Sequence, residues 1–209
     1  MRKKRGILWF VNLAALMLFL VMLFTVLNDV WLIDVDAYVN RYMHQIRLVW
    51  LTPLVHLLTD MNGFVGAALF SAVVIAFFLG RRWYRETGFF LLATLGATVL
   101  FAGVKYMVAR ARPEAAMIEV GGYSFPSGHT TMATAMAFAL YFTLSQKCSN
   151  GWFKSLLFFT ALGWSVLIAL TRLYLGVHWF TDVVGGFGLG LWWVTLIRLF
   201  WKEPDKIRV

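Results

Sequence analysis

Charged residues are scarce in this chain. They make up 14% of its 209 residues, whereas hydrophobic residues make up 61%. With a mean hydropathy of +0.74, this composition excludes an ordinary water-soluble fold and predicts an integral membrane protein. Cysteine is scarcer still, because Cys148 is the only one. A single cysteine excludes an intramolecular disulfide and gives no indication of redox chemistry.

The chain also lacks the features that separate domains. It contains no Pro/Ser-rich linker, no low-complexity run and no long internal repeat. The predicted inner turns, 81–86 and 146–151, are short. We therefore expect residues 1–209 to form a single integral-membrane domain.

Long apolar runs, in contrast, are abundant. Five of them are long enough to cross a bilayer as helices of ~20 residues: 7–27, 62–80, 87–108, 152–170 and 182–201. A sixth run, 130–145, is shorter and more mixed, and we interpret it as spanning because its helix can begin in the preceding turn and pack against its neighbours. The predicted fold class is an all-α membrane protein with six transmembrane helices.

The segment between the first two runs, residues 28–61, has a different pattern. Apolar residues recur in it at helical spacing among polar ones: Val35, Val39, Tyr42, Ile46, Val49 and Leu57. This pattern predicts an amphipathic helix on the outer membrane surface, broken near Pro53. His44 and His56 belong to this segment, and we assign neither of them a catalytic role.

The formal net charge of +9 is an orientation signal in this interpretation. Threading six spans from a cytoplasmic N-terminus places 13 Lys and Arg residues inside and 6 outside, as the positive-inside rule requires. The cluster at residues 2–5 precedes an apolar run as in a signal peptide, but no small-residue cleavage site follows Leu27, so we expect an uncleaved first helix. Both termini are predicted to be cytoplasmic, and no nucleic-acid partner is expected.

Three polar islands interrupt the apolar sequence: 105–113 (KYMVARARP), 126–129 (PSGH) and 171–182 (TRLYLGVHWFTD). The predicted topology places all three on the outer side. Ionisable groups at membrane depth are costly, and their convergence on one side indicates a functional site. Cleavage of a phosphate ester needs cations, a nucleophile and a proton donor, and the islands contain all of these.

The cations have complementary chemistry for a phosphate. Lys105 and Arg112 are seven residues apart, so on a continuous helix, which we expect Pro113 to end, they would share one face. Arg112 can bind phosphate oxygens bidentately, whereas Lys105 acts as a point charge. Gly128 allows the backbone to approach an anion, and the amides that begin the fourth span would point at it.

The histidines provide the nucleophile and the acid. His178 and Asp182 are four residues apart, so the carboxylate can accept the imidazole N–H and leave the other ring nitrogen free to attack. His129 is then available as the general acid. These three side chains could also bind a metal, but the surrounding Arg and Lys residues would repel a cation. We therefore expect a metal-independent mechanism and no cofactor.

At these residues the chain resembles the type 2 phosphatidic acid phosphatase superfamily. The family signature reads Lys, six residues, Arg-Pro; then Pro-Ser-Gly-His; then Ser-Arg, five residues, His, three residues, Asp. The chain matches every position in order and spacing, except that Thr171 replaces the Ser. Because Thr keeps the hydroxyl, we expect activity to be retained.

The resemblance implies a phosphorylated His178 as intermediate, with His129 protonating the leaving alkoxide. It also implies five residues that hold the phosphoryl group: Lys105, Arg112, Ser127, Gly128 and Arg172. Arg110 lies outside the signature. We interpret it as a snorkelling cation, with binding of a second phosphate or of the lipid headgroup as the alternative.

The predicted function is that of a lipid phosphatase in a bacterial inner membrane, with its site on the extracytoplasmic side. Its expected partners are membrane lipids and a lipid substrate: undecaprenyl diphosphate, phosphatidylglycerophosphate or phosphatidate. Within the same family, a lipid phosphotransferase or a lipid A phosphatase is the alternative, and the motif would also suit an organelle membrane.

Two alternatives come from other classes. An anion or lipid transporter would also use buried cations, but no inverted repeat or Gly/Pro-broken helix pair is detectable. A catalytically dead structural protein would not be expected to keep His129, His178, Asp182 and every cation of the signature.

Overall fold

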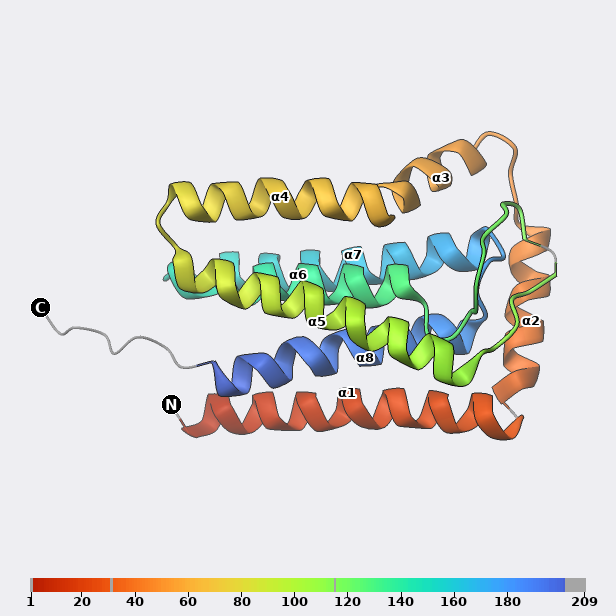
Figure 1. Ribbon diagram of the computed structural model, residues 1–209, viewed down its shortest axis with the longest axis horizontal. Coiled ribbons are helices and arrows are strands. Elements are labelled where there is room, and N and C mark those ends of the chain that lie inside the picture. Colours follow the sequence, from red (N-terminus) through yellow and green to blue (C-terminus); the bar gives the residue numbers. More distant parts are fainter. Residues whose placement is uncertain (1, 31, 115, 202–209) are drawn as a thin grey trace, which may run out of the picture.

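The computed structural model describes residues 2–30, 32–114 and 116–201, and throughout these ranges the only regular secondary structure is helical (Figure 1). The helices are α1 (Arg2–Asn28), α2 (Leu32–Gln45), α3 (Thr52–Asp60), α4 (Phe64–Gly80), α5 (Tyr84–Val108), α6 (Gly128–Lys147), α7 (Gly151–Tyr174) and α8 (Phe180–Phe200). This confirms the all-α class.

The six long helices run side by side along the long axis, while α2 lies across one end of the bundle (Figure 1). Helix α6 packs against α5, α7 and α8, and α1 packs along α8. Two glycines of α8 permit the closest approach to α6. A Cβ atom at Gly186 would lie 2.7 Å from the carbonyl oxygen of Ser127, and one at Gly190 would lie 2.6 Å from that of Thr131.

Among the described residues, four helices are long and apolar enough to cross a membrane: residues Arg5–Asn28 of α1, together with α5, α7 and α8. Helices α3 and α4 meet this criterion only as a pair bent by 51°, which gives up to five spans. The prediction of six spans is therefore not confirmed. Helix α6 has the length, but it contains His129 and several buried threonines, so its hydropathy is lower.

The predicted amphipathic segment at residues 28–61 is not confirmed. Its helix is interrupted close to Pro53, between α2 and α3, but Pro53 itself lies in the first turn of α3, where its missing N–H costs nothing. Val49, assigned to the apolar face, is 94% exposed, whereas Asp36 is 1% exposed. In α2 the residue that is buried is Asp36, so a carboxylate and its partners lie on the buried face of this helix.

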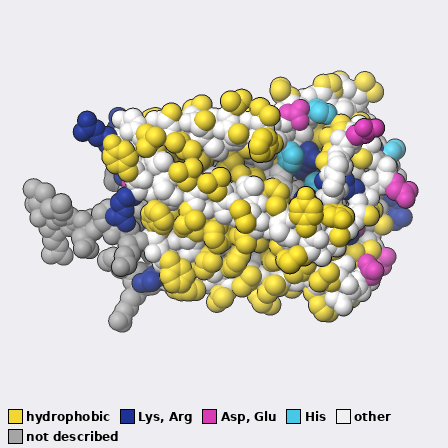
Figure 2. Space-filling model, viewed as in Figure 1, with side chains coloured by type: hydrophobic (Ala, Val, Ile, Leu, Met, Phe, Trp, Pro, Cys, Tyr) yellow, Lys and Arg dark blue, Asp and Glu magenta, His cyan; other side chains and the backbone are white. Residues whose placement is uncertain are grey.

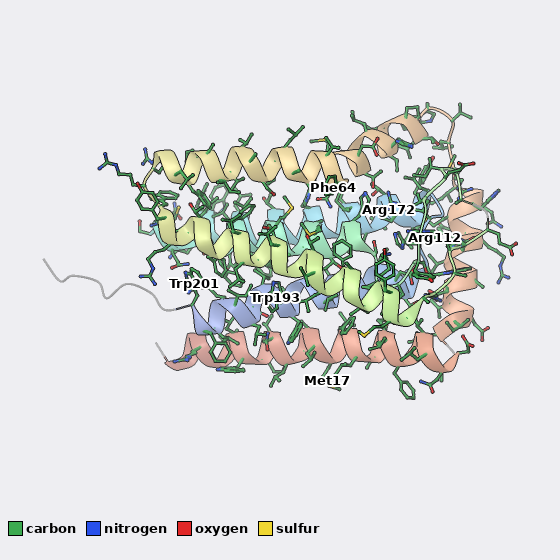
Figure 3. The ribbon with its side chains drawn as sticks, viewed as in Figure 1. Met17, Phe64, Arg112, Arg172, Trp193 and Trp201 are labelled. Carbon is green, nitrogen blue, oxygen red and sulfur yellow. The ribbon has the colours of Figure 1, made fainter. Side chains whose placement is uncertain are left out.

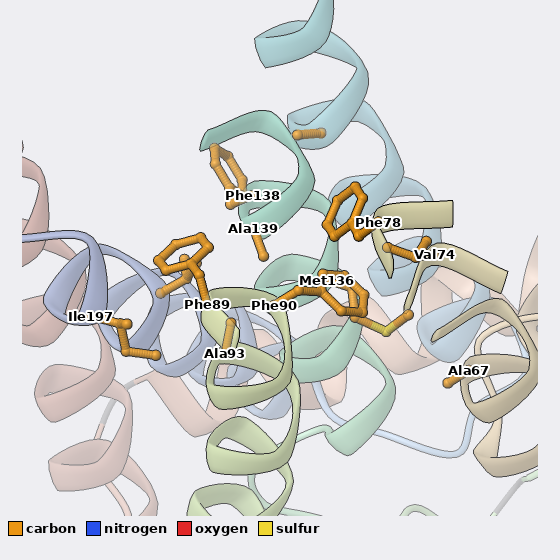
Figure 4. Packing of buried hydrophobic residues seen from close by; sticks show 12 residues of the cluster. Ala67, Val74, Phe78, Phe89, Phe90, Ala93, Met136, Phe138, Ala139 and Ile197 are labelled. Atoms are coloured by element: carbon orange, nitrogen blue, oxygen red, sulfur yellow. The ribbon is translucent and has the colours of Figure 1, made fainter. Parts of the chain in front are cut away.

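The main hydrophobic core lies between α4, α5, α6, α7 and α8. Phe78, Phe90 and Phe138 are among its buried members and pack with smaller residues such as Ala93 and Ala139 (Figure 4). On the outside, large apolar side chains such as Phe64 (90% exposed) cover much of the bundle (Figure 2), and Met17 points away from it (Figure 3). An apolar exterior of this kind suits lipid as solvent.

Candidate active site

Polar side chains gather at the end of the bundle formed by α2, α3, the α5–α6 loop and the α7–α8 turn. Figure 2 shows histidine and cationic side chains together at this end, and Figure 3 shows Arg112 and Arg172 near each other there. The three sequence islands therefore meet in space, because each lies at or beside a helix end on this side of the bundle.

His178 is the central residue of this site. It lies in the α7–α8 turn, and its Nδ1 is 3.4 Å from Oδ2 of Asp182 in the first turn of α8. On the other side of the ring, Nη1 of Arg112 is 3.3 Å from Nε2. Because a guanidinium only donates hydrogen bonds, this contact makes Nε2 the acceptor and places the ring proton on Nδ1. The geometry thus favours the tautomer whose free lone pair is on Nε2.

Burial keeps this imidazole neutral. His178 is 3% exposed, and burial lowers its pKa from 6.5 to about 4, against the opposing effect of the Asp182 carboxylate. The positive charges of Arg172 and Arg112 contribute to this lowering of the pKa, because they disfavour an imidazolium. At neutral pH the ring is therefore an uncharged base, whose Nε2 lone pair accepts the hydrogen bond from Arg112.

Asp182 is fixed from several sides. It is 0% exposed, and its Oδ2 accepts the backbone N–H of Trp179 at 2.9 Å. Its Oδ1 accepts from Nη1 of Arg110 at 2.7 Å. The carboxylate therefore presents Oδ2 to His178 while Oδ1 is held elsewhere.

Lys105 and Arg112 reach the site from different local structures, which corrects one expectation. Helix α5 ends at Val108 because Ala109 adopts a left-handed conformation with φ of 51°, so Arg112 lies in the following loop and the two cations do not share a helical face. Lys105 donates to the carbonyl of Tyr123 at 2.6 Å. Proline at position 113 is not what stops the helix.

Arg112 holds three backbone carbonyls. Its Nη1 donates to Val177 at 2.7 Å, Nε to Gly122 at 3.0 Å and Nη2 to Gly121 at 3.2 Å. Burial lowers the pKa of this guanidinium, and the Asp182 carboxylate opposes that effect. The side chain remains a cation, because arginine does not deprotonate in proteins.

Arg172 comes from the last turn of α7 and is 2% exposed. Its Nη1 donates to the hydroxyl of Thr59 on α3 at 2.9 Å, while its Nε is buried without a hydrogen-bond partner among the described residues. Within those residues, neither Lys105, Arg112 nor Arg172 forms a salt bridge. Three cations without a carboxylate partner make the site attractive to an anion.

The PSGH island forms the start of α6. Ser127 caps the helix, accepting from the N–H and hydroxyl of Thr130, and its own N–H donates to the Asp182 carbonyl at 3.0 Å. Gly128 packs so tightly that a Cβ atom would lie 2.9 Å from the Phe101 ring. His129 follows in the first turn, and its electrostatic neighbours are Arg172, His178, Arg112 and Lys105. All the predicted site residues therefore lie at this end.

Sequence reasoning missed several partners. Asp36 and Thr59 belong to the predicted surface segment, and Asn62, whose side chain donates to the His129 carbonyl at 2.8 Å, falls at the start of a predicted span. Arg110 is not a snorkelling cation, because it forms ion pairs with Asp36 and Asp182 at 2.6 and 2.7 Å. An acidic residue inside an otherwise amphipathic helix was the available signal for Asp36.

A hollow lies next to the site, and the side chain of Thr171 forms a hydrogen bond within its own helix. A hollow of about 540 Å³ on the α5–α6 loop is lined by Arg112, Pro113, Glu114, Ala116, Met117, Ile118, Glu119, Val120 and Gly121, so it meets the predicted site residues only at Arg112. The hydroxyl of Thr171 donates to the carbonyl of Ile168 within α7 at 2.7 Å. Across residues 2–30, 32–114 and 116–201, no three His, Cys, Asp or Glu side chains are placed to hold a metal ion.

The chain is similar to known proteins along most of its length. Residues 87–205 match the family model of the PAP2 superfamily. The chain is 30% identical over 199 residues to phosphatidylglycerophosphatase B of Bacillus subtilis (strain 168), covering 93% of this chain and 97% of that one. It is 32% identical over 127 residues to the undecaprenyl-diphosphatase of Sulfolobus acidocaldarius, covering 57% of each.

A solved structure resembles the whole bundle. The crystal structure of a transmembrane PAP2 type phosphatidylglycerolphosphate phosphatase from Bacillus subtilis superposes with a TM-score of 0.85 at 25% identity. The alignment covers 94% of this chain and 98% of that one. The likeness therefore extends to the described helices outside the three islands.

Proposed function

This chain belongs to the PAP2 superfamily of phosphatases, and we propose that it hydrolyses a lipid phosphate through a phosphorylated His178. One observation carries the proposal: the buried His178 has Nδ1 next to Asp182 and Nε2 facing the cation Arg112. That arrangement places a neutral nucleophile at an anion-binding position.

The first chemical step is attack of Nε2 of His178 on the phosphorus atom. As the N–P bond forms, the P–O bond to the leaving group breaks, and His129 gives a proton to the departing oxygen. Asp182 stabilises the positive charge that develops on the imidazole. In the second step a water oxygen attacks phosphorus, His129 takes one of its protons, and the N–P bond breaks to release inorganic phosphate and neutral His178.

Three cations neutralise the phosphoryl oxygens in this mechanism: Lys105, Arg112 and Arg172. The buried Nε of Arg172 is a donor still able to take an acceptor such as a phosphate oxygen. Ser127 and Gly128 supply the N-terminal turn of α6, whose backbone N–H groups favour an anion. The mechanism requires no metal ion, because the protein itself supplies the positive charge.

The orientation of the protein follows the distribution of its cations. We propose a single domain with α1, α4, α5, α6, α7 and α8 as six spans and with the site on the extracytoplasmic side of a bacterial inner membrane. The opposite end includes Arg81 and Arg82 in the α4–α5 turn, Arg85 in the first turn of α5, and the α6–α7 turn. Residues 202–209, whose cytoplasmic placement is part of the proposal, lie outside the described residues.

The substrates that fit best are lipids with an exposed phosphate. Two relatives are named for phosphatidylglycerophosphate and undecaprenyl diphosphate, and an acyl or prenyl chain would suit the exposed apolar side chains of the bundle. Phosphatidate is the third candidate.

The decisive experiment is release of inorganic phosphate by the detergent-purified protein in excess chelator. The panel contains phosphatidylglycerophosphate, undecaprenyl diphosphate, phosphatidate and a lipid A 1-phosphate. We expect at least one lipid to be hydrolysed, and we expect His178→Ala to abolish release while His44→Ala, an exposed control on α2, retains it. A substrate carrying labelled phosphate should leave an acid-labile label on the wild-type protein and none on His178→Ala.

Two results would overturn the proposal. Full activity of His178→Ala would exclude it as the nucleophile, and loss of all activity in chelator would exclude the metal-independent mechanism. Transfer of phosphate to another lipid without release would indicate the phosphotransferase alternative.

A further inference from the structure

Helix α2 contributes one buried carboxylate to this end of the bundle. Asp36 is 1% exposed and accepts three hydrogen bonds. Two come from Thr181 in the first turn of α8, from its N–H at 2.8 Å and from its hydroxyl at 2.7 Å. The third comes from Nη2 of Arg110 at 2.6 Å. Asp36 therefore joins α2 to the helix that carries Asp182.

Arg110 bridges the two carboxylates. Its Nη1 donates to Oδ1 of Asp182 and to the Thr181 hydroxyl, both at 2.7 Å. Its guanidinium also lies over the Trp179 ring, 5.4 Å from the centroid. Both Nη atoms are engaged, so Arg110 differs from Arg112 and Arg172, which have no carboxylate partner. This geometry argues against a role for Arg110 in binding phosphate.

We propose that Asp36 and Arg110 are positioning residues that set the orientation and effective charge of Asp182 behind His178. The proposal rests on the phosphohistidine mechanism above. Arg110 anchors Oδ1 of Asp182, and this leaves Oδ2 directed at the His178 ring. A carboxylate free to rotate would lose this alignment, and outer partners of this kind orient the residues they contact.

The charges explain why an acidic residue, rather than any hydrogen-bond acceptor, occupies position 36. Arg110 alone beside Asp182 would cancel much of the negative charge that must stabilise the developing imidazolium of His178. With Asp36 on its other side, Arg110 is shared between two carboxylates, so the group of three keeps a net charge of about −1. Asp36 thus preserves the electrostatic effect of Asp182 at the ring.

This inference makes a prediction about charge balance. Asp36→Asn leaves Arg110 uncompensated and should lower kcat. Removing both charges in the double variant Asp36→Asn/Arg110→Gln restores the balance, so it should be more active than Asp36→Asn alone. A residue that only supports folding would change the melting temperature of these variants but leave kcat of the folded protein unchanged. Asp34→Asn, which removes an exposed carboxylate from the same helix, is the matched control.

The assay is steady-state phosphate release in detergent on phosphatidylglycerophosphate, or on the panel lipid that the wild type prefers, with thermal melting of each variant. We expect Asp36→Asn to lower kcat at least tenfold with KM within threefold, and Asp34→Asn to stay within twofold. The double variant should recover at least threefold over Asp36→Asn. If Asp36→Asn gives no melting transition, Arg110→Lys is compared with Arg41→Lys at an exposed position. Lysine keeps the charge but lacks the two fixed NH2 groups with which Arg110 contacts Asp36 and Asp182.

The inference is overturned if Asp36→Asn behaves like Asp34→Asn, if the double variant is no more active than Asp36→Asn, or if Arg110→Lys matches Arg41→Lys. An active wild type with an inactive His178→Ala would in those cases still support the phosphatase mechanism. If the wild type itself releases no phosphate from any lipid of the panel, the proposed function fails and this inference fails with it.

Discussion

Replacing Asp182 with asparagine tests the electrostatic core of the mechanism with a nearly isosteric change. The carboxylate lies 3.4 Å from Nδ1 of His178 and is 0% exposed, so water does little to screen this pair. An asparagine cannot stabilise an imidazolium by charge. If its amide group turns toward the ring, it also favours the tautomer with the proton on Nε2, which removes the attacking lone pair.

The size of the effect follows from Coulomb's law. At an effective dielectric constant of about 20, a full charge at 3.4 Å from the carboxylate is stabilised by about 5 kcal/mol. The imidazole charge is only partly developed in the transition state, so the effect is smaller than this limit, and we expect kcat to fall by about 10²- to 10³-fold. KM should change much less, because Asp182 does not contact the phosphoryl oxygens in the proposed mechanism.

The chain contains a matched control for this experiment. His56 and Asp60 form a second His–Asp pair with the same four-residue spacing, 3.0 Å apart, but their side chains are 42% and 64% exposed. Exposed pairs contribute about 0–1 kcal/mol, so Asp60→Asn should change kcat by no more than about fivefold. The assay is phosphate release in detergent, with melting curves to verify folding. The reasoning fails if folded Asp182→Asn keeps more than about a tenth of wild-type kcat, or if Asp60→Asn is equally damaging.

Two further predictions concern protonation and orientation. Because burial penalises the charged imidazole, His178 with its pKa of about 4 should remain neutral, protonated at Nδ1, from pH 8 down to about pH 5. Nitrogen NMR of histidine-labelled protein, assigned with His178→Gln, should show this, and a His178 signal that titrates near 6.5 would contradict it. In the proposed topology Cys148, in the α6–α7 turn, faces the cytoplasm, so a membrane-impermeant maleimide should not label it in intact spheroplasts. The variant Cys148→Ser/Val49→Cys should be labelled, since Val49 is 94% exposed at the other end, and the reverse pattern would invert the topology.

Local sequence properties were enough to predict most of the helical layout. The apolar runs are long and end at polar turns, and each of α1, α4, α5, α7 and α8 lies close to its predicted range. Prediction was less successful for 28–61. Helical spacing identifies an apolar stripe, but it does not show whether that stripe or Asp36 is the buried side, because the answer depends on a partner 74 residues away.

The sequence by itself determined which functional groups form the site: His178 with Asp182, His129, and three cations. It also predicted that they lie together, because their islands lie beside helix ends on one side of the bundle. Only the tertiary structure decided how these groups are held. Ala109 adopts a left-handed backbone conformation that its residue type does not predict, and α5 therefore ends before Arg112. Arg110 acquires two carboxylate partners through packing of α2 against α8. Spacing along the chain determines which side chains share a turn of helix, whereas contacts between distant segments depend on how whole helices pack.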